Sequence, residues 1–144
     1  MKRHDSLAPL SREHHESLLL AQILKKNAPP YRGMPTGGAQ KVALAASLFH
    51  EKIREHFTRE DSLLDTLSAT HPELNQFRQE IQSEHHLLSE AFESLRAESP
   101  DPAAMDALGQ ALEKHIRKEE RIVFPLIEQL CSEAELNQIR DLHA

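Results

Sequence analysis

The prolines and glycines of the chain are confined to a few places and leave long uninterrupted stretches between them. Both residues disfavour helix interiors, because proline lacks a backbone N–H and glycine has excess backbone freedom. The stretch 39–68 contains neither residue, whereas the segment 27–38 is rich in both and is the one long loop signal. This distribution predicts four helical segments at about 6–26, 39–68, 72–98 and from residue 102 onward.

Residues at the segment boundaries support this division. Asp101 suits an N-cap and Pro102 the first position of the fourth helix. Pro125 is expected to kink or end that helix after Phe124. The stretch 132–135 (Ser-Glu-Ala-Glu) fits a capping box and predicts a short further helix. The sequence therefore predicts an all-α fold, an up-and-down antiparallel four-helix bundle with a short C-terminal fifth helix.

Length and charge narrow the possible functions. A chain of 144 residues can bury one core, so we expect a single domain over residues 1–144. Its 17 basic and 23 acidic residues give a net charge of −6, which disfavours binding to nucleic acid. No apolar run approaches the roughly 20 residues that span a bilayer, so no membrane association is expected. The single cysteine excludes an internal disulfide and favours a location in the cytoplasm.

The ten histidines are the unusual feature of the composition. Successive helical residues are about 100° apart, so each histidine can be placed relative to the apolar stripe of its segment. In the fourth segment this stripe comprises Leu108, Leu112, Ile122 and Leu126. Across the four segments, one histidine each and two glutamates face the stripe: His14, His56, Glu60, His85, His115 and Glu119. Their neighbours His15, His86 and Glu120 are predicted to point away.

Two of the inward histidines precede an inward glutamate by four residues, at 56–60 and 115–119. This spacing stacks the two side chains on one helix face, so that both can reach one metal centre. The spacing alone is weak evidence, because the off-face pair His86 and Glu90 has it too. A single inward histidine is more often a core residue bonded to a carbonyl group. Two buried carboxylates without partners would be costly, however, and metal binding would satisfy all six groups.

The types of side chain indicate which metal to expect. Imidazole and carboxylate groups without an inward thiolate favour iron, manganese or zinc. Six ligands are too many for a tetrahedral zinc site and suit two cations that share carboxylates. We therefore expect two iron ions in a di-iron centre, with zinc or manganese as alternatives. A ferritin-type site would use Glu-x-x-His pairs, and the sequence contains none.

Four stretches of the sequence resemble the hemerythrin-like proteins with the HHE cation-binding domain. They are LSREHHESLLLAQIL, HFTREDSLL, SEHHLLSEAF and HIRKEERIVFPLIE. The family pattern has one histidine on the first and third helices and His-x-x-x-Glu on the second and fourth. The doubled histidines 14–15 and 85–86 leave a choice of one residue, which the facing argument decides in favour of His14 and His85.

The resemblance implies a role for each inward residue. Glu60 and Glu119 would bridge two irons. Each iron would have its own pair of histidines: His14 with His56, and His85 with His115. Oxygen-carrying hemerythrins have a further histidine where this chain has Ser89, and an aspartate ligand where it has Glu120. These differences imply a more open site and favour sensing, redox chemistry or iron handling over oxygen storage.

The sequence thus predicts a cytoplasmic, non-haem di-iron protein of hemerythrin type. It would bind or sense O2, NO or peroxide, or handle iron, and no protein partner follows from the sequence. An enzyme of peroxide turnover or iron–sulfur repair would share the same site. The alternative is a metal-free helical signalling bundle, such as a histidine phosphotransfer domain. That class needs a solvent-exposed histidine, whereas the distinctive histidines here face inward.

Overall fold

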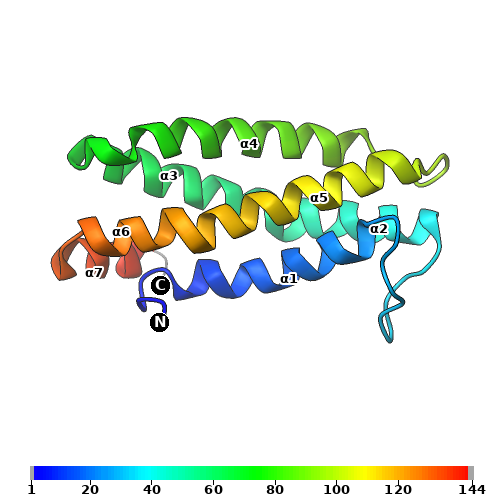
Figure 1. Cartoon of the computed structure of the whole chain (residues 1–144), viewed down its shortest axis with the longest axis horizontal. Coiled ribbons are helices and arrows are strands. Elements are labelled where there is room, and N and C mark those ends of the chain that lie inside the picture. Colours follow the sequence, from blue (N-terminus) through cyan, green and yellow to red (C-terminus); the bar gives the residue numbers. More distant parts are fainter. Residues whose placement is uncertain (1, 143–144) are drawn as a thin grey trace.

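Four long helical rods lie side by side in the computed structural model, which describes residues 2–142 (Figure 1). The first rod is α1 (Ala8–Leu24). The second runs without a break through α2 (Gly38–Leu48), a π-helical segment (Phe49–Ile53) and α3 (Arg54–Thr70). The third consists of a 3₁₀ turn (Pro72–Leu74) and α4 (Asn75–Ser94). The fourth joins α5 (Pro102–Lys118), a second π-helical segment (Glu119–Val123) and α6 (Phe124–Leu130).

Each rod packs against its neighbours around the bundle axis. α1 contacts α5 and α3, α3 contacts α4, and α4 contacts α5. The short helix α7 (Glu133–Leu142) lies at the end of the bundle where α1 begins, and the loop after α1 lies at the opposite end (Figure 1). The predicted all-α four-helix bundle with a short fifth helix is confirmed. Within residues 2–142, none of the helices has the length and apolar character needed to cross a membrane.

The capping signals act as the sequence predicts. The Asp101 carboxylate accepts hydrogen bonds from the backbone N–H groups of Ala103 and Ala104. Ser132 and Glu135 form the reciprocal pair of a capping box, in which each side chain accepts from the other's backbone N–H. These bonds satisfy N–H groups that lack a partner within the helix, so they fix where α5 and α7 begin.

The fourth rod does not end at Pro125, contrary to one of the two expected outcomes. A π-helical segment ends two residues before this proline, and the Phe124 N–H donates to the carbonyl five residues back, that of Glu119. In the same pattern, the N–H of residue 125 would donate to the carbonyl of Glu120, but Pro125 has no N–H. The carbonyl of Glu120 accepts instead from the guanidinium of Arg3 at 2.8 Å. The helix therefore continues through Pro125 as far as Leu130.

The π-helical segment also shifts which side chains face the core. Ile122, which the apolar stripe places inside, is 49% exposed, whereas Val123 is fully buried. A π-helical turn contains an extra residue compared with an α-helical turn, so the inward positions beyond it move by one. Phe124 and Ile127 are buried in this shifted register. The prediction for Ile122 is wrong because it assumes an uninterrupted α-helical period.

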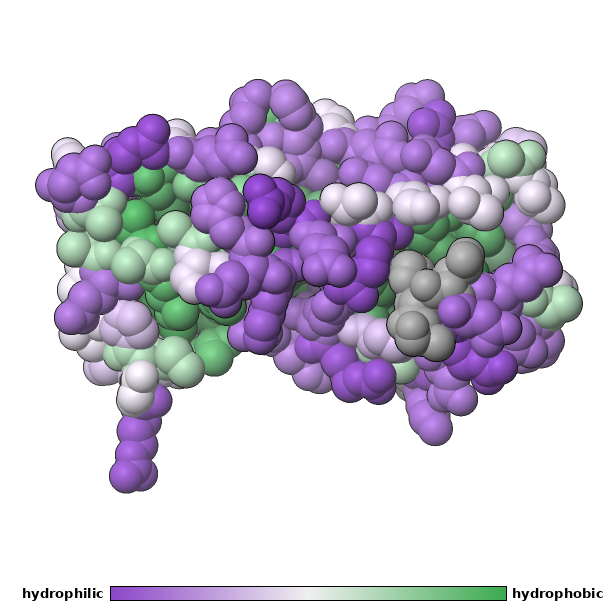
Figure 2. Space-filling view, turned by 180° about the vertical axis from the view of Figure 1, so that it is seen from behind, coloured by the Kyte–Doolittle hydropathy of each residue, from purple (hydrophilic) through white to green (hydrophobic). Residues whose placement is uncertain are grey.

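The core consists of two apolar clusters at opposite ends of the bundle. One lies towards α2 and includes Ala21, Phe49, Phe92, Leu108 and Leu112. The other lies towards α7 and includes Leu10, Leu64, Ile81, Val123 and Ile127. The face of the molecule in Figure 2 is mostly hydrophilic, with an apolar area towards the end that carries α2. Between the two clusters the four rods present polar side chains to the axis, and these form the site.

Candidate metal centre

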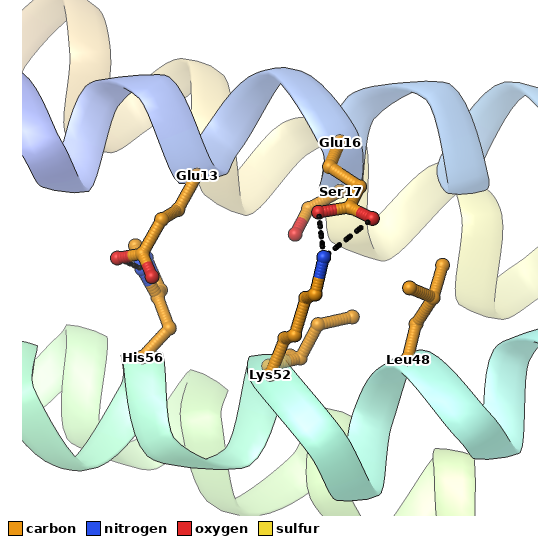
Figure 3. A pocket seen from close by; sticks show the side chains of 7 residues that line it. Glu13, Glu16, Ser17, Leu48, Lys52 and His56 are labelled. Carbon is orange, nitrogen blue, oxygen red and sulfur yellow. Dashed lines mark hydrogen bonds and ion pairs between the residues drawn. The ribbon is translucent and has the colours of Figure 1, made fainter.

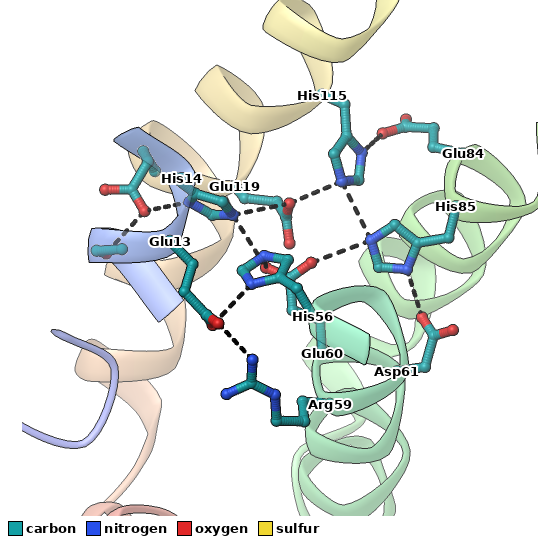
Figure 4. Close-up of polar contacts among 12 residues, drawn as sticks. Glu13, His14, His56, Arg59, Glu60, Asp61, Glu84, His85, His115 and Glu119 are labelled. Carbon is teal, nitrogen blue, oxygen red and sulfur yellow. Dashed lines mark hydrogen bonds and ion pairs between the residues drawn. The ribbon is translucent and has the colours of Figure 1, made fainter. Parts of the chain in front are cut away.

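Six ionisable side chains meet between the apolar clusters, at least one from each rod (Figure 4). All six are buried, with at most 5% of any residue exposed. His14 and His85 lie near the middle of α1 and α4, and His56 and Glu60 lie in the first two turns of α3. The fourth rod contributes the end of α5 and the beginning of its π-helical segment. The six are those that the facing argument selects: His14, His56, Glu60, His85, His115 and Glu119. Their role as ligands stays a prediction, but the structure brings them together.

The structure also separates the doubled histidines. His14 and His85 lie in the buried cluster, whereas His15 and His86 are exposed. The ring of His86 lies 2.8 Å from Glu90, an exposed pair with the same four-residue spacing as the buried pairs. The angular position on the helix therefore distinguishes the inward pairs from this surface pair.

Glu60 connects two groups of histidines. Its Oε2 lies 3.1 Å from Nε2 of His14 and 3.0 Å from Nε2 of His56. Its Oε1 lies 3.1 Å from Nε2 of His85. One carboxylate oxygen thus faces each histidine group. This is the arrangement that a carboxylate shared between two cations requires.

Glu119 occupies the corresponding place on the fourth rod. Its Oε1 lies 2.7 Å from Nε2 of His115, one helical turn before it, and 3.5 Å from Nε2 of His14. Neither oxygen of Glu119, nor Nε2 of His56, has a well-directed hydrogen-bond partner within residues 2–142. Buried polar atoms are rarely left in this state, because desolvation without a partner is costly. These atoms are available to a ligand that accepts lone pairs.

The outer nitrogen of every inward histidine is hydrogen-bonded to a carboxylate. The Nδ1 atoms lie 2.7 to 3.0 Å from these oxygens. The pairs are His14 with Glu120, His56 with Glu13, His85 with Asp61, and His115 with Glu84. An ionised carboxylate can only accept, so each Nδ1 donates. In a neutral ring this leaves the Nε2 lone pair directed at the centre, the pattern typical of metal-bound histidines.

These four carboxylates form a closed ring around the bundle. Each is the chain neighbour of an inward residue, and each holds the histidine of the next rod: Glu13 of α1 reaches α3, Asp61 of α3 reaches α4, Glu84 of α4 reaches α5, and Glu120 reaches α1. A neighbour is rotated by about 100° on its helix, so it points to the adjacent rod when the ligand position points to the axis.

The sequence interpretation misses this ring of carboxylates. Glu120 is expected to point away, yet its half-buried carboxylate lies 2.8 Å from Nδ1 of His14. The expectation fails because an apolar stripe marks only the side of a helix that faces the core and says nothing about contacts at its flanks. The available signal is an acidic residue directly beside each of His14, Glu60, His85 and Glu119.

The carboxylates make the cluster strongly favour positive charge. Burial alone would lower the pKa of these histidines, but the contacts of His14 with Glu119, Glu120 and Glu60 raise its pKa to about 12. Burial is likewise outweighed at His56, where the charge of Glu60 raises the pKa to about 9. At His115 the charge of Glu119 outweighs burial and raises the pKa to about 10. Protons can supply this positive charge, and so can metal cations that displace them.

Two ring nitrogens approach each other in a way that also favours a cation. Nε2 of His85 lies 3.1 Å from Nε2 of His115. When both Nδ1 atoms carry the proton, neutral rings bring two lone pairs face to face, which is unfavourable. A cation between the two lone pairs removes this repulsion. The donor types, the unpartnered atoms and this contact all fit bound metal.

The four inward histidines and two glutamates divide into two overlapping groups. Glu60, His85, His115 and Glu119 form one group, and His14, His56 and Glu60 form the other. Within each group the possible ligand atoms lie within 4.8 Å of one another. Because Glu60 belongs to both, the cluster has the composition of two adjacent cation sites.

A small pocket between α1 and the second rod reaches His56 from the surface (Figure 3). Its lining includes Glu13 and Ser17, and the exposed ion pair of Glu16 and Lys52 lies across it at 3.1 Å. Phe57 and Phe124 close the interior, since they stack on His85 and His14 with ring centroids 4.1 and 5.5 Å apart. The centre therefore has apolar walls and a narrow polar approach.

Comparison with known proteins agrees with this geometry. Searches of curated proteins and of solved structures return no match. The sequence does match a protein family, described as the hemerythrin HHE cation binding domain, over residues 5–127. That range contains all six inward residues and the four carboxylates around them. The chain belongs to the hemerythrin HHE cation-binding family.

Proposed function

We propose that this chain is a non-haem di-iron protein of hemerythrin type, which binds or senses O2, NO or peroxide, or handles iron. The observation that carries the proposal is Glu60, whose two oxygens face different histidine groups at 3.0 to 3.1 Å. Family membership supports cation binding, and the overlapping ligand groups support two ions.

Each of two ions would have its own pair of histidines. His14 and His56 would hold one ion, His85 and His115 would hold the other, and Glu60 and Glu119 would be shared between them. With two imidazoles and shared carboxylates, each ion would have fewer than six protein ligands, which would leave positions open for a small molecule. When bound, a pair of irons supplies redox-active cations that can coordinate O2, NO or peroxide.

The surrounding residues keep the centre in place. The four outer carboxylates fix the orientation of the imidazoles and increase their basicity towards a cation. Three of them are held in turn by groups on the protein: Glu13 by Arg59, Glu84 by Lys118 and Glu120 by Ser11. The stacked rings of Phe57 and Phe124 restrict access of water. Ser89, which lines a surface pocket beside His85, stands where a further histidine would narrow the approach.

The first prediction is that the protein contains about two irons per chain when it is produced with iron in air. The measurement is metal analysis of the purified protein, together with its absorption spectrum. Glu60→Ala is expected to lose both irons, because Glu60 is common to the two groups. Glu90→Ala, on the exposed pair with His86, is the matched control and is expected to retain them.

Two results would contradict the proposal. One is a single tightly bound zinc with no iron, which would fit a mononuclear site. The other is a Glu60→Ala variant that folds and keeps two irons. A protein with two manganese or two zinc ions would keep the dinuclear site and correct only the identity of the metal.

A further inference from the structure

A second cluster of metal-binding side chains lies at the α7 end of the bundle. It consists of His71, which follows α3, Cys131, which ends α6, and Glu135 in the first turn of α7. His71 is 71 − 60 = 11 residues after Glu60, or roughly 16 Å along a helix axis at about 1.5 Å per residue. Leu64 and Leu67 of the apolar core lie between the two positions on α3. The cluster is therefore separate from the six-residue centre.

The possible ligand atoms of the cluster are already close together. Nε2 of His71 lies 2.7 Å from Oε2 of Glu135. One ligand atom from each of the three residues, including the sulfur of Cys131, lies within 4.8 Å of the others. A tetrahedral zinc site with ligands at about 2.0 to 2.3 Å brings its ligand atoms closer than this, so modest side-chain movement completes it.

The backbone around the cluster is fixed by its own hydrogen bonds. The N–H of His71 donates to Leu67, and that of Cys131 donates to Ile127. Oε1 of Glu135 accepts from the Ser132 N–H in the capping box, which leaves Oε2 directed at His71. The helix ends therefore fix the backbone of these residues, and the contact between His71 and Glu135 already orients two of the three side chains. Such an arrangement lowers the cost of ordering the ligands when an ion binds.

The chemistry of the three ligands is mixed. Thiolate, imidazole and carboxylate together favour zinc or a similar borderline divalent cation over calcium or magnesium. The cysteine is buried, with 8% exposed, whereas His71 and Glu135 are partly exposed and offer an entry path. We propose that His71, Cys131 and Glu135 form a zinc-type site with three protein ligands and one position for water.

Binding at this site has a defined proton balance. Burial and the nearby charge of Glu135 raise the pKa of Cys131 to about 11, so the thiol is protonated in the absence of metal. The ion displaces that proton when the sulfur binds, and His71 binds through Nε2 as a neutral ring. Bound metal would join the turn after α3 to the turn before α7.

The single cysteine makes the test specific. Cobalt(II) is the probe, because a thiolate bound to it gives a charge-transfer band in the near ultraviolet. Any such band must come from Cys131, since the sequence has no other cysteine. Iron-loaded protein is titrated with cobalt at mildly alkaline pH under a thiol-free reductant, and the spectrum of Cys131→Ser treated in the same way is subtracted.

We expect a difference band that saturates at one cobalt per chain and is removed by one equivalent of zinc. His71→Ala is expected to weaken cobalt binding by about tenfold or more, the scale seen when a metal site loses a supporting group. His86→Ala, an exposed histidine elsewhere, is the matched control and should leave the titration unchanged. Cys131→Ser should retain the two irons, which keeps this test independent of the proposed di-iron function.

Three results would overturn the proposal. The first is the absence of a thiolate band in the unaltered protein. The second is saturation at half a cobalt per chain, which would indicate sulfur ligands from two molecules. The third is a cobalt affinity that His71→Ala does not change, which would leave Cys131 without the partner that the structure gives it.

Discussion

Each inward histidine receives its orientation from a residue on another helix. The imidazole of His85, for example, is fixed by Asp61 at 2.7 Å on one side and faces Glu60 at 3.1 Å on the other. The two carboxylates belong to consecutive residues of α3, so one short segment determines the orientation of the His85 imidazole. Within residues 2–142, the exposed His86 pairs only with Glu90 of its own helix. The difference between adjacent histidines is thus a difference in contacts with neighbouring helices.

Substitution of the adjacent histidines should separate these roles. His14→Ala and His85→Ala are each expected to lose iron or its absorption, because each removes an Nε2 atom from the centre. His15→Ala and His86→Ala are expected to keep wild-type iron and to change the free energy of unfolding by no more than about 0.5 kcal/mol, as is usual at surface positions. Iron analysis and thermal unfolding of the four variants provide the measurement.

On α1, the choice between His14 and His15 as the iron ligand is the harder one to make. Leu19, next to the buried Leu20, widens the apolar surface of α1 towards His15. Loss of iron in His15→Ala with retention in His14→Ala would therefore shift the ligand by one residue. That outcome would show that the burial of a histidine does not identify the iron ligand on α1.

At the scale of helices, α1 and α5 approach closely at Gly109. A β-carbon at this position would lie 2.6 Å from the carbonyl oxygen of Ala21 and 3.3 Å from Leu24. The close approach of the two helices therefore explains why a glycine occupies this position despite its low helix propensity. It brings together the two rods that carry His14 and His115.

Gly109→Ala is expected to destabilise the protein by about 1 to 3 kcal/mol, the usual range for overpacking, although alanine is the better helix former. Gly37→Ala is the matched control, because its added β-carbon meets only a side-chain oxygen of Gln40 at 3.8 Å. Denaturant unfolding of both variants measures the difference. A Gly109→Ala variant as stable as the control would show that α1 can move away from α5 at no cost.

The helices also differ in how much of their structure can be predicted from the sequence. The caps at Asp101 and Ser132 depend on residues two or three positions away, so local patterns suffice for them. The burial of His14 and His85 follows from angular position within uninterrupted α-helices. Ile122 is placed wrongly because the π-helical segment changes the period, and no local pattern announces that change. The link from Glu120 to His14 is missed because it spans two helices distant in sequence.

At the scale of the whole molecule, metal binding and folding are coupled. The two apolar clusters can stabilise the bundle without an ion, and an ion that binds only the folded chain adds stability by mass action. We expect removal of metal to lower the melting temperature without abolishing the fold. Apo and holo thermal melts that superimpose would contradict this.

The difference between apo and holo melts should widen as the pH rises. In the metal-free protein the pKa values of His56, His115 and His14 are raised from 6.5 to about 9, 10 and 12. Their contribution to stability is complete below pH 6.5, where both states are protonated, and is lost as the pH rises through these values. Metal binding instead improves as protons leave the ligands. Melts at increasing pH above 6.5 measure the divergence.

The carboxylate ring also has a direction around the bundle axis. It runs from α1 to α3, α4, α5 and back to α1, and every contact joins neighbouring rods. In a bundle of the opposite handedness, Glu13 would face the fourth rod and Glu120 would face α4, so none of the four histidines would meet its carboxylate. Axial slippage of one rod would break two contacts at once, the one it gives and the one it receives. The ring thus selects both the chirality and the register of the bundle, which apolar packing alone specifies only weakly.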